Sequence, residues 1–506
     1  MNLADLLRAA ARENGGKRAL AYGETVPEAE LAYAELDAEV DRVARGLAAK
    51  GVSRGDRVAI AMPNVPHFVF AYLGILRAGA IVVPLNAMLT GREVTGVLED
   101  STPKLILGAG EVGTLAESAA GGLGLQTLTV DRWDELGPAG EAFEGVDRDD
   151  DDLAVLAYTS GTTGRPKGAM LSHGNLLANL EQQSRIPEDR VTSEDVLLLT
   201  LPLFHIFGLN VPLGLLLKNA ASGVLLERFE PVATLRAIEK RKVSILFGAP
   251  PMYRAWVATP GADQYDLSSV RLAISGAAPI PTEVIAGFRN LFGIEIDEGY
   301  GLTETAPTLT SNRMMPRPKP GSVGAPLPGV ELRIVDDGGD EVEIGDTGEI
   351  VVRGPNVFKG YWQQPAETDR VFTDGWFHTG DIAVRDEQGY IYLVDRKRDL
   401  VIVSGFNVFP SEVEAALLEN PDVAEAAVVG VPHEYRGESL KAYVVLEPGA
   451  ETSQRELLAD ARTRLARFKL PETIEIVEDL PHLMTGKVLR RALRSSSEQE
   501  NVSTPA

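Results

Sequence analysis

The sequence predicts an α/β protein with more than one domain. Up to about Gly321, short apolar runs alternate with stretches whose apolar residues recur at helical spacing, which is typical of parallel sheets covered by helices on both faces. Beyond that point the segments become strand-rich and are separated by Gly, Pro and Asp clusters, which favours a barrel-like or antiparallel subdomain. At 506 residues with 44% hydrophobic content, the chain exceeds the size at which one core usually stops growing.

The individual elements follow from periodicity. Leu36, Val40, Val43 and Leu47 recur at helical spacing, and residues 66–77 predict another helix. Apolar runs bounded by turn residues predict strands at 58–62, 81–85, 105–107, 153–158, 196–201, 243–247, 270–274, 330–335, 348–353, 390–394 and 400–403.

A domain boundary is predicted near residues 395–399, DRKRD, which separate two apolar runs. Ser411 and Glu414 have the spacing of a capping box, so we expect Ser411 to be the N-cap of a helix that ends at Leu418. The residues that follow suit a small α+β domain with a helix at 488–494, and residues 495–506 have the composition of a tail.

Composition disfavours several classes of protein. The formal net charge of −24 repels DNA, RNA and anionic lipid. The absence of cysteine excludes disulfides, thiolate metal sites and cysteine nucleophiles. Residues 1–13 are charged and have no long apolar core, so we expect no secretory signal and a cytoplasmic location. Residues 461–494 carry eight Lys/Arg against four Asp/Glu, and they form either a polyanion contact or a solvated helical face.

Residues 196–217 form a run of 22 uncharged residues, which is long enough to raise the question of a membrane span. Two prolines, two glycines, His205 and Asn210 interrupt this run. Such interruptions favour a buried strand, a loop and a short helix over a lipid-exposed helix.

Residues 159–168, TSGTTGRPKG, carry the most chemical information. Glycines let the backbone approach phosphate oxygens, successive N–H groups can form an anion nest, and the hydroxyls of Ser160, Thr162 and Thr163 add donors. Lys167 supplies positive charge. The Walker A spacing is absent, which disfavours an ordinary P-loop NTPase. A flexible surface loop is the competing interpretation, but a predicted buried strand directly before the loop argues against a linker.

Six further motifs follow in order: LPLFH (201–205), SGAAP (275–279), YGLTET (300–305), WFHTGD (376–381), DRKRD (395–399) and TGK (485–487). With the glycine loop, they resemble the AMP-forming acyl-CoA synthetase family, and within it bacterial long-chain fatty-acid–CoA ligases. The resemblance covers essentially the whole chain. It implies a large N-terminal domain of αβαβα layers with a β-barrel-like subdomain at residues 1–396. It also implies a small mobile α+β domain at residues 397–506, with a hinge near Arg398.

The reaction that the resemblance implies agrees with these residue types. A carboxylate attacks the α-phosphate of ATP to give an acyl-adenylate and pyrophosphate, and the thiol of coenzyme A then displaces AMP. Both half-reactions develop negative charge on oxygen atoms, which positioned cations and N–H donors stabilise. The implied cofactors and co-substrates are therefore ATP, Mg²⁺ and CoA.

The resemblance also implies a role for each site residue. Thr303 would contact phosphate, and Glu304 would help to hold Mg²⁺, a hard cation that prefers carboxylate oxygen. Tyr300 would stack on adenine. The residues expected to bind nucleotide or CoA are Thr159, Ser160, Gly161, Thr162, Thr163, Gly164, Lys167, Gly276, Ala277, Glu298, Gly299, Tyr300, Thr303, Asp381, Arg396, Ser404, Gly405 and Lys487. Within this set, Asp381 and Arg396 would bind the ribose hydroxyls, and Ser404 and Gly405 would border the pantetheine tunnel.

Lys487 is the expected adenylation catalyst, because the family places this ammonium between the carboxylate and the α-phosphate. It lies in the small domain, so catalysis would require the two domains to close. Relatives usually carry Asp or Lys where Arg398 stands, but a long basic side chain should tolerate the backbone change at a hinge. Many plant relatives have lysine at the position of Ile402, which puts one phosphate contact in doubt.

The substrate is expected to be an apolar monocarboxylate. His205 would gate the acyl tunnel or orient the carboxylate. The predicted pocket walls are Phe204, Phe207, Phe247, Gly248, Pro250, Met252 and Gly299, and they include no obvious cation for a second carboxylate. A medium- or long-chain fatty acid is favoured, since burial of each methylene contributes about 0.8 kcal/mol. An aryl acid such as a coumarate is the alternative.

Three other functions stay open from the sequence. A standalone amino-acid adenylating enzyme would need an acidic residue for the substrate ammonium, and we locate none. A luciferase-like oxygenase would share the adenylation residues. A non-catalytic binding protein would be expected to have lost Lys487 or Glu304, yet both are present. A homodimer is expected by analogy alone.

Overall fold

The computed structural model describes residues 1–23, 29–138, 140, 142–159, 166–187, 190–403, 406–433, 437–482, 488–490 and 492–494. The chain divides into two compact units. Unit 1 comprises Met1–Glu331 and Val352–Phe377, and unit 2 comprises Leu332–Val351 and His378–Ala506.

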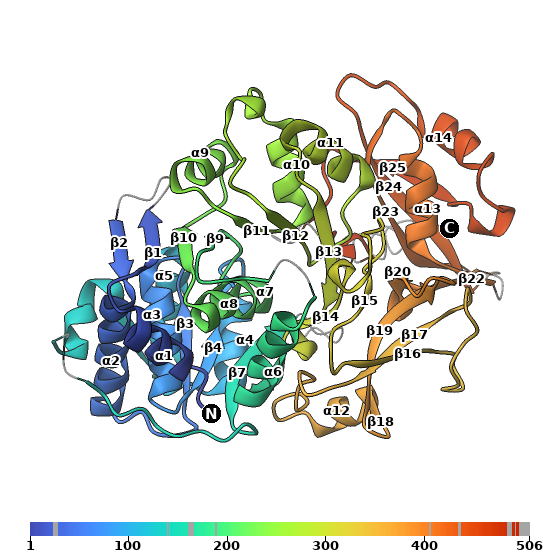
Figure 1. Cartoon of the computed structure of the whole chain (residues 1–506). Coiled ribbons are helices and arrows are strands. Elements are labelled where there is room, and N and C mark those ends of the chain that lie inside the picture. Colours follow the sequence, from blue (N-terminus) through green and yellow to red (C-terminus); the bar gives the residue numbers. More distant parts are fainter. Residues whose placement is uncertain are drawn as a thin grey trace. The chain divides into compact units, whose positions relative to one another are not determined.

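The first sheet of unit 1 has the order β6-β5-β3-β4-β7-β8 among the described residues (Figure 1). Its strands are β3 (Arg57–Ala61), β4 (Ile81–Pro84), β5 (Leu105–Gly108), β6 (Gln126–Thr129), β7 (Leu153–Thr159) and β8 (Lys167–Ser172). Neighbours pair in parallel except β7 and β8, which are antiparallel. The helices between these strands are α3 (Pro66–Arg77), α4 (Gly91–Ser101) and α5 (Gly110–Leu123), with the 3-10 helix η1 (Val130–Leu136) after β6. Strand residues such as Val83 and Ile106 join Leu98 and Ala116 from the helices in one buried cluster.

The second sheet of unit 1 has the order β15-β14-β13-β12-β11-β9-β10-β1-β2 within the described ranges. Its bounds are β1 (Arg18–Gly23), β2 (Ala29–Ala32), β9 (Val196–Leu199), β10 (Ser222–Leu226), β11 (Ile245–Gly248), β12 (Leu272–Ser275), β13 (Ile296–Gly301), β14 (Thr308–Ser311) and β15 (Ala325–Pro326). The strands β1, β10, β9, β11, β12 and β13 are parallel to their neighbours, and antiparallel strands flank them at both edges.

Further helices of unit 1 accompany these strands. They are α1 (Asp5–Asn14), α2 (Tyr33–Ala49), α6 (His173–Ser184), α7 (Ile206–Asn210), α8 (Pro212–Asn219), α9 (Pro231–Arg241), α10 (Pro250–Ala258), α11 (Thr282–Phe292) and α12 (Pro365–Val371), with the 3-10 helices η2 (Ala262–Gln264), η3 (Thr303–Thr305) and η4 (Asn312–Met314). The helix predicted from Leu36 to Leu47 is therefore α2, and that predicted at 66–77 is α3. Every strand predicted in the first half of the chain is present with end shifts of a few residues.

The uncharged run at residues 196–217 forms β9, a loop, and the two short helices α7 and α8, which confirms the predicted arrangement. Asn64 fixes the loop, because its amide donates to the Leu201 carbonyl at 2.9 Å and its oxygen accepts from the Leu203 N–H at 2.8 Å. Among the described helices, none has the length and hydropathy required to cross a membrane.

The strand-rich texture predicted after Gly321 is confirmed. In the described part of the chain, a third sheet has the order β16-β17-β19-β18, with β20 paired to β19. The bounds are β16 (Glu331–Val335), β17 (Thr347–Arg353), β18 (Phe372–Thr373), β19 (Trp376–Arg385) and β20 (Ile391–Arg396). The pairs β18–β19 and β19–β20 are antiparallel.

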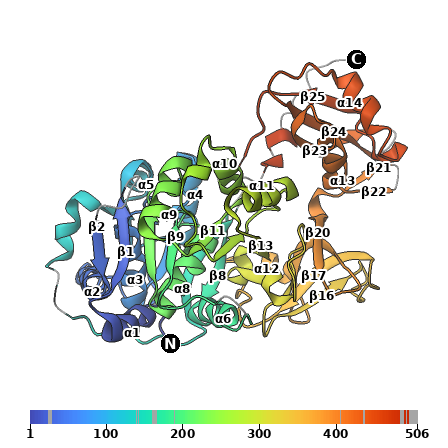
Figure 2. The ribbon, with the colours of Figure 1, turned by 45° about the horizontal axis from the view of Figure 1, so that its top comes forward.

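The C-terminal part of unit 2 is an α+β arrangement. Its described sheet has the order β22-β21-β24-β23, with β25 paired to β24, and α13 and α14 lie beside it (Figure 2). The bounds are β21 (Val401–Val403), β22 (Phe406–Val408), α13 (Pro410–Leu418), β23 (Val423–His433), β24 (Gly437–Leu446), α14 (Gln454–Ala461) and β25 (Thr473–Ile476), with the 3-10 helices η5 (Lys397–Asp399) and η6 (Arg467–Lys469). Val413 and Leu417 of α13 pack with Val428 and Ala442 of the sheet.

Two boundary predictions in unit 2 were wrong. Ser411 is not an N-cap, because α13 begins at Pro410, whose fixed φ and missing N–H suit the first helical position. Ser411 instead ties α13 to β20, since its N–H donates to Asp395 at 2.9 Å and its hydroxyl donates to the Val394 carbonyl at 2.7 Å. The helix predicted from Val488 starts later: Val488 pairs with His482 in a β-bridge, and the described helical residues begin at Arg490.

Asp195 links the start of β9 to its neighbours. The residue is buried and accepts from Thr192 N–H at 2.8 Å, the Ser244 hydroxyl at 2.8 Å and the Arg271 guanidinium at 2.6 Å. Burial raises the pKa of Asp195, but the hydrogen bonds from Arg271, Thr192 and Ser244 outweigh it and hold the pKa below its ordinary value.

We predict that Asp195→Asn lowers the free energy of unfolding by about 2–3 kcal/mol at pH 7, because Arg271 then loses its ionic partner. A carboxyl with a depressed folded pKa stabilises above its unfolded pKa, so the deficit should shrink as the pH falls below about 4. Urea unfolding at pH 7 and pH 3 measures both effects. Asp266→Asn, which removes an exposed partner of Lys242, should leave the urea midpoint unchanged.

Candidate active site

One group of the predicted site residues lies at or just after the carboxyl ends of neighbouring strands in the second sheet. Gly248 of β11 is in register with Ser275 of β12, and Ser275 is in register with Glu298 of β13. Parallel strands present their carboxyl ends at one edge, so the loops that follow them meet there. These loops and strand ends carry Pro250, Gly276, Ala277, Gly299, Tyr300, Thr303 and Glu304, and the loop after β9 carries His205.

The backbone around the expected adenine position is tightly constrained. A Cβ on Gly276 would lie 3.0 Å from the ring of Phe207, so glycine lets this ring approach the loop after β12. Ala277 has a positive φ of 73°, which a residue with a side chain rarely adopts and which clusters at functional sites. Tyr300 is buried at the end of β13.

Glu298 joins this loop to a second one. Its side chain is buried, and its carboxyl accepts from the backbone N–H of Gly321 at 2.9 Å and from that of Ile280. Burial raises the pKa of Glu298 to about 7 although both hydrogen bonds oppose the shift. Glu298 therefore holds the loops beside Tyr300, which is a structural contribution that the sequence did not indicate.

The carboxylate of Glu304 is oriented by Tyr361, whose hydroxyl donates to Glu304 Oε1 at 2.9 Å. The Glu304 carbonyl accepts from the Phe358 N–H at 2.8 Å. The segment 358–362 also exchanges main-chain hydrogen bonds with Gly168 and Met170 of β8. One segment thus connects Glu304 to the strand that follows the glycine loop.

The glycine loop joins two antiparallel strands, since Thr159 at the end of β7 is in register with Lys167 at the start of β8. A Walker A loop instead leads into a helix, so this hairpin agrees with the missing Walker A spacing. Lys167 Nζ lies 2.5 Å from Glu367 Oε2 and 5.2 Å from the ring centre of Tyr361. The predicted phosphate-binding residues Ser160, Gly161, Thr162, Thr163 and Gly164 lie outside the described residues.

His205 is the N-cap of α7, and its Nδ1 accepts from the Phe207 N–H at 3.3 Å. Burial lowers the pKa of His205 to about 4, so the imidazole is neutral at pH 7. Phe207 meets Phe247 edge to face with ring centres 6.4 Å apart. Both rings and Met252 are buried, which places apolar walls next to this histidine.

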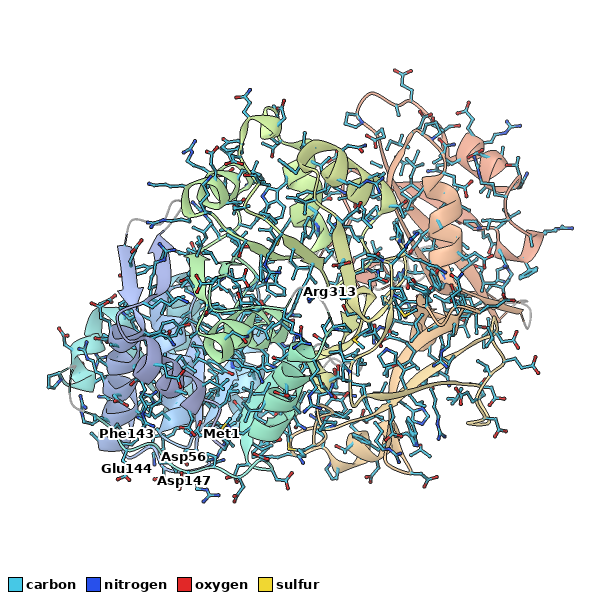
Figure 3. The ribbon with its side chains drawn as sticks, viewed as in Figure 1. Met1, Asp56, Phe143, Glu144, Asp147 and Arg313 are labelled. Atoms are coloured by element: carbon cyan, nitrogen blue, oxygen red, sulfur yellow. The ribbon has the colours of Figure 1, made fainter. Side chains whose placement is uncertain are left out.

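A cavity of about 240 Å³ has Phe247, one of the expected pocket walls, in its lining. Its lining residues are Gln183, Ser184, Arg190, Val191, Leu215, Lys218, Asn219, Phe247 and Arg313. Arg313, labelled in Figure 3, lies in η4 next to β14. The expectation that the predicted pocket walls lack a buried cation for a second carboxylate stays a prediction. Apart from Phe247, the sequence did not indicate these residues, because they come from α6, α8, η4 and the segment between α6 and β9 and share no motif.

In unit 2, Asp381 of β19 lies opposite Arg396 of β20, and Arg396 Nε is 2.5 Å from Asp381 Oδ1. The structure therefore pairs the two residues expected to contact ribose. Arg398, the expected hinge, belongs to η5, and Ile402 is exposed in β21. Ser404, Gly405 and Lys487 fall outside the described residues.

Several cations of the basic segment at residues 461–494 have carboxylate partners among the described residues. Arg464 pairs with Glu419, Lys469 with Glu412, and Arg490 with Glu414. Ion pairing of this kind weakens the interpretation of the segment as an open polyanion contact.

A protein-family model described as AMP-binding enzyme matches residues 7–362, and the model of the AMP-binding enzyme C-terminal domain matches residues 412–487. The chain belongs to the AMP-binding enzyme family. It is 35% identical to a long-chain-fatty-acid–CoA ligase of Bacillus subtilis over 93% of this chain and 90% of that protein. It is 41% identical to a feruloyl-CoA synthase of an Amycolatopsis species over 92% of this chain and 93% of that protein.

Solved structures agree with this assignment. The crystal structure of ATP-bound MatB from Rhodopseudomonas palustris matches with a TM-score of 0.90 and 37% identity over 99% of this chain and 100% of that one. The predicted α/β fold class and the resemblance to AMP-forming acyl-CoA synthetases are both confirmed. The protein is an AMP-forming acid–thiol ligase that uses ATP and CoA.

Since we expect Glu304 to hold Mg²⁺, we predict that Tyr361→Phe raises the Mg²⁺ concentration required for half-maximal pyrophosphate release by about 10-fold, because Glu304 loses the donor that orients it. Steady-state assays over a Mg²⁺ series measure this change. Tyr392→Phe is the matched control, since Tyr392 also donates to a carboxylate, Asp386, but in unit 2. An unchanged Mg²⁺ requirement in Tyr361→Phe would contradict the orienting role.

We also predict that His205→Asn lowers kcat/KM for the acid by about 10-fold at every pH from 6 to 8, since misplacing a positioning group slows the reaction. Asparagine can still cap α7, so the helix should remain intact. Burial holds the pKa of His205 near 4, so its protonation does not change in this range and the pH profiles of variant and parent should be parallel. If kcat/KM of the wild-type enzyme changes near pH 6.5 and this change is absent from His205→Asn, His205 is not neutral throughout this range and the prediction is wrong.

Proposed function

We propose that this enzyme is a fatty acid–CoA ligase. The observation that carries the proposal is the apolar environment of His205, where Phe207, Phe247 and Met252 are buried. Burial lowers the pKa of His205, which agrees with these apolar surroundings. An alkyl chain gains free energy from burial against such walls. The 35% identity to the Bacillus subtilis fatty-acid ligase supports the same substrate class.

The proposed reaction has two displacements. An oxygen of the fatty-acid carboxylate bonds to the α-phosphorus of ATP, and the bond to the β-phosphate oxygen breaks to release pyrophosphate. The CoA thiol then loses its proton, its sulfur bonds to the acyl carbon, and AMP leaves with the electron pair. In this proposal the glycine loop holds the β- and γ-phosphates, Thr303 contacts phosphate, and Lys487 neutralises the charge that develops at the α-phosphate. Asp381 and Arg396 hold the ribose.

Glu304 is the proposed Mg²⁺ ligand. Within the described ranges, no group of three or more His, Cys, Asp or Glu side chains gathers to hold a metal. A single carboxylate suits Mg²⁺, which usually takes few protein ligands and completes its shell with substrate phosphates and water. Bound there, Mg²⁺ would neutralise phosphate charge.

The proposal extends to the domain organisation. We place the boundary between residues 1–396 and 397–506, with Arg398 as the hinge and Ser404 and Gly405 at the pantetheine tunnel. A cytoplasmic location and a homodimer remain predictions.

An oxygenated aryl acid is the second candidate substrate. The cavity beside Phe247 has Arg313, Lys218 and Gln183 in its wall, and such groups suit ring oxygens better than a methyl end. The 41% identity to a feruloyl-CoA synthase favours the same class.

A substrate panel tests the proposal: fatty acids of increasing length, ferulate, coumarate, malonate and amino acids, assayed for pyrophosphate release and for acyl-CoA. For a fatty-acid ligase, kcat/KM should rise about 4-fold per methylene until the pocket is filled. A higher kcat/KM for ferulate than for every fatty acid would overturn the proposal in favour of the aryl acid. If an amino acid supports pyrophosphate release but no acyl-CoA forms from any acid, both the fatty-acid ligase and the aryl-acid ligase are excluded.

Arg313→Met separates the two candidates further. For a fatty-acid ligase the variant should retain or improve its kcat/KM with fatty acids, because a methionine wall is apolar. For an aryl-acid ligase it should lose about 10-fold with ferulate, since a hydrogen bond to the ring oxygen is removed.

A further inference from the structure

A buried ionic cluster in unit 2 surrounds Arg490. Three carboxylates, Asp395, Asp399 and Glu414, face two guanidinium groups, Arg490 and Arg494. Asp395 is the last but one residue of β20, Asp399 ends η5, which follows β20 directly, and Glu414 belongs to α13. The cluster therefore joins the end of β20 with η5, α13, and the segment that carries Arg490 and Arg494.

Arg490 is the centre of this cluster. Its Nη2 lies 2.7 Å from Glu414 Oε2 and 2.9 Å from Oε1, while Nη1 lies 3.4 Å from Asp399 and 3.5 Å from Asp395. Arg494 adds a contact of 3.1 Å to Asp399. A planar guanidinium can satisfy several carboxylates in fixed directions at once, which a lysine ammonium cannot reproduce.

The cluster is well shielded from solvent. The side chains of Asp395, Asp399, Glu414 and Arg490 are 3%, 9%, 13% and 18% exposed. Burial raises the pKa of Glu414 even though Arg490 opposes the shift. Desolvation cancels much of the attraction within buried ion pairs, so such a cluster fixes geometry more than it adds stability. The location of the cluster therefore determines which part of the chain it holds in place.

Arg490 lies three residues after Lys487 of the Thr485-Gly486-Lys487 motif. Val488 forms a bridge with His482, and the Leu489 N–H donates to the Pro481 carbonyl at 2.7 Å. The residues on either side of 483–487 are therefore held together, and we call them the base of this segment. Arg490 connects the base to β20, η5 and α13 through its ion pairs. The side chain of Glu414 is itself fixed, because it accepts from the Val428 N–H at 2.7 Å.

We propose that Arg490 is a positioning residue for adenylation: its contacts with Glu414, Asp399 and Asp395 fix the base of the segment that presents Lys487. This inference rests on the proposed function, in which Lys487 acts in the first half-reaction. The contacts of Arg490 also involve residues on both sides of the proposed hinge at Arg398. Asp395 precedes Arg398, whereas Glu414 follows it, so a backbone rotation at Arg398 changes the Asp395 contacts and preserves those of Glu414.

The test compares the two half-reactions in the full-length enzyme. Pyrophosphate release with acid and ATP reports adenylation, and acyl-CoA formation from supplied acyl-adenylate and CoA reports thioester formation. We expect Arg490→Gln to lower the rate constant of adenylation by about 100-fold, because a displacement of about 1 Å has that effect. Thioester formation should change less than about 3-fold, since Lys487 is not required there. Arg490→Lys should recover part of the loss, because it restores the charge without the fork.

A second variant and a control variant allow the test to be interpreted even if Arg490→Gln does not fold. Glu414→Gln preserves shape and removes the main partner of Arg490, so it should slow adenylation selectively even if Arg490→Gln does not fold. Arg464→Gln is the control, because Arg464 also pairs with two carboxylates of unit 2, Glu419 and Asp460, and should leave both half-reactions unchanged. Thermal midpoints of all variants separate unfolding from misplacement.

Equal losses in both half-reactions, or no loss in either, would overturn the inference. Lys487→Ala, assayed in parallel, separates that failure from failure of the proposed function. If Lys487→Ala abolishes adenylation while Arg490→Gln and Glu414→Gln show no selective loss, the positioning role alone is rejected. If Lys487→Ala retains adenylation, the proposed role of the lysine fails and the inference fails with it.

Discussion

The register of β11, β12 and β13 is the constraint on which the site of unit 1 depends. These strands bring Gly248, Ser275 and Glu298 side by side, so every loop that leaves their carboxyl ends starts from the same edge. A slip of one residue would move each side chain to the opposite face of the sheet. The loops that follow β12 and β13 therefore start side by side, and the ring of Phe207, two residues after His205, lies close to Gly276 in the loop after β12.

One glycine and one alanine with a positive φ then shape the backbone at that edge. Gly276 makes room for Phe207, and Ala277 accepts a left-handed backbone where most residues would not. Behind them, Glu298 bonds to Gly321 and keeps the loops in place. The packing of Phe207 against Gly276 and the hydrogen bonds of the buried Glu298 carboxyl thus fix the loops next to Tyr300.

Local pairing governs the electrostatics of this acidic protein more than its net charge of −24. The cations expected to meet phosphate or ribose are held by carboxylates: Lys167 by Glu367, and Arg396 by Asp381. Arg490 has the same kind of environment, with Glu414 and two aspartates. A carboxylate partner orients a long basic side chain before the ligand arrives, and a phosphate must compete with that partner for the cation.

Periodicity and motif spacing are local properties of the chain, so the α/β class, most strands and helices, and the motifs that lead to the family could be predicted from the sequence. It misplaced the start of α13, since Ser411 finds its partners in β20 rather than in its own helix. The tertiary structure alone decided that Tyr361 orients Glu304, that Arg313 shares a cavity with Phe247, and that Arg490 meets three carboxylates. Such contacts join residues that are far apart in the sequence, and no local sequence pattern predicts them because only folding brings these residues together.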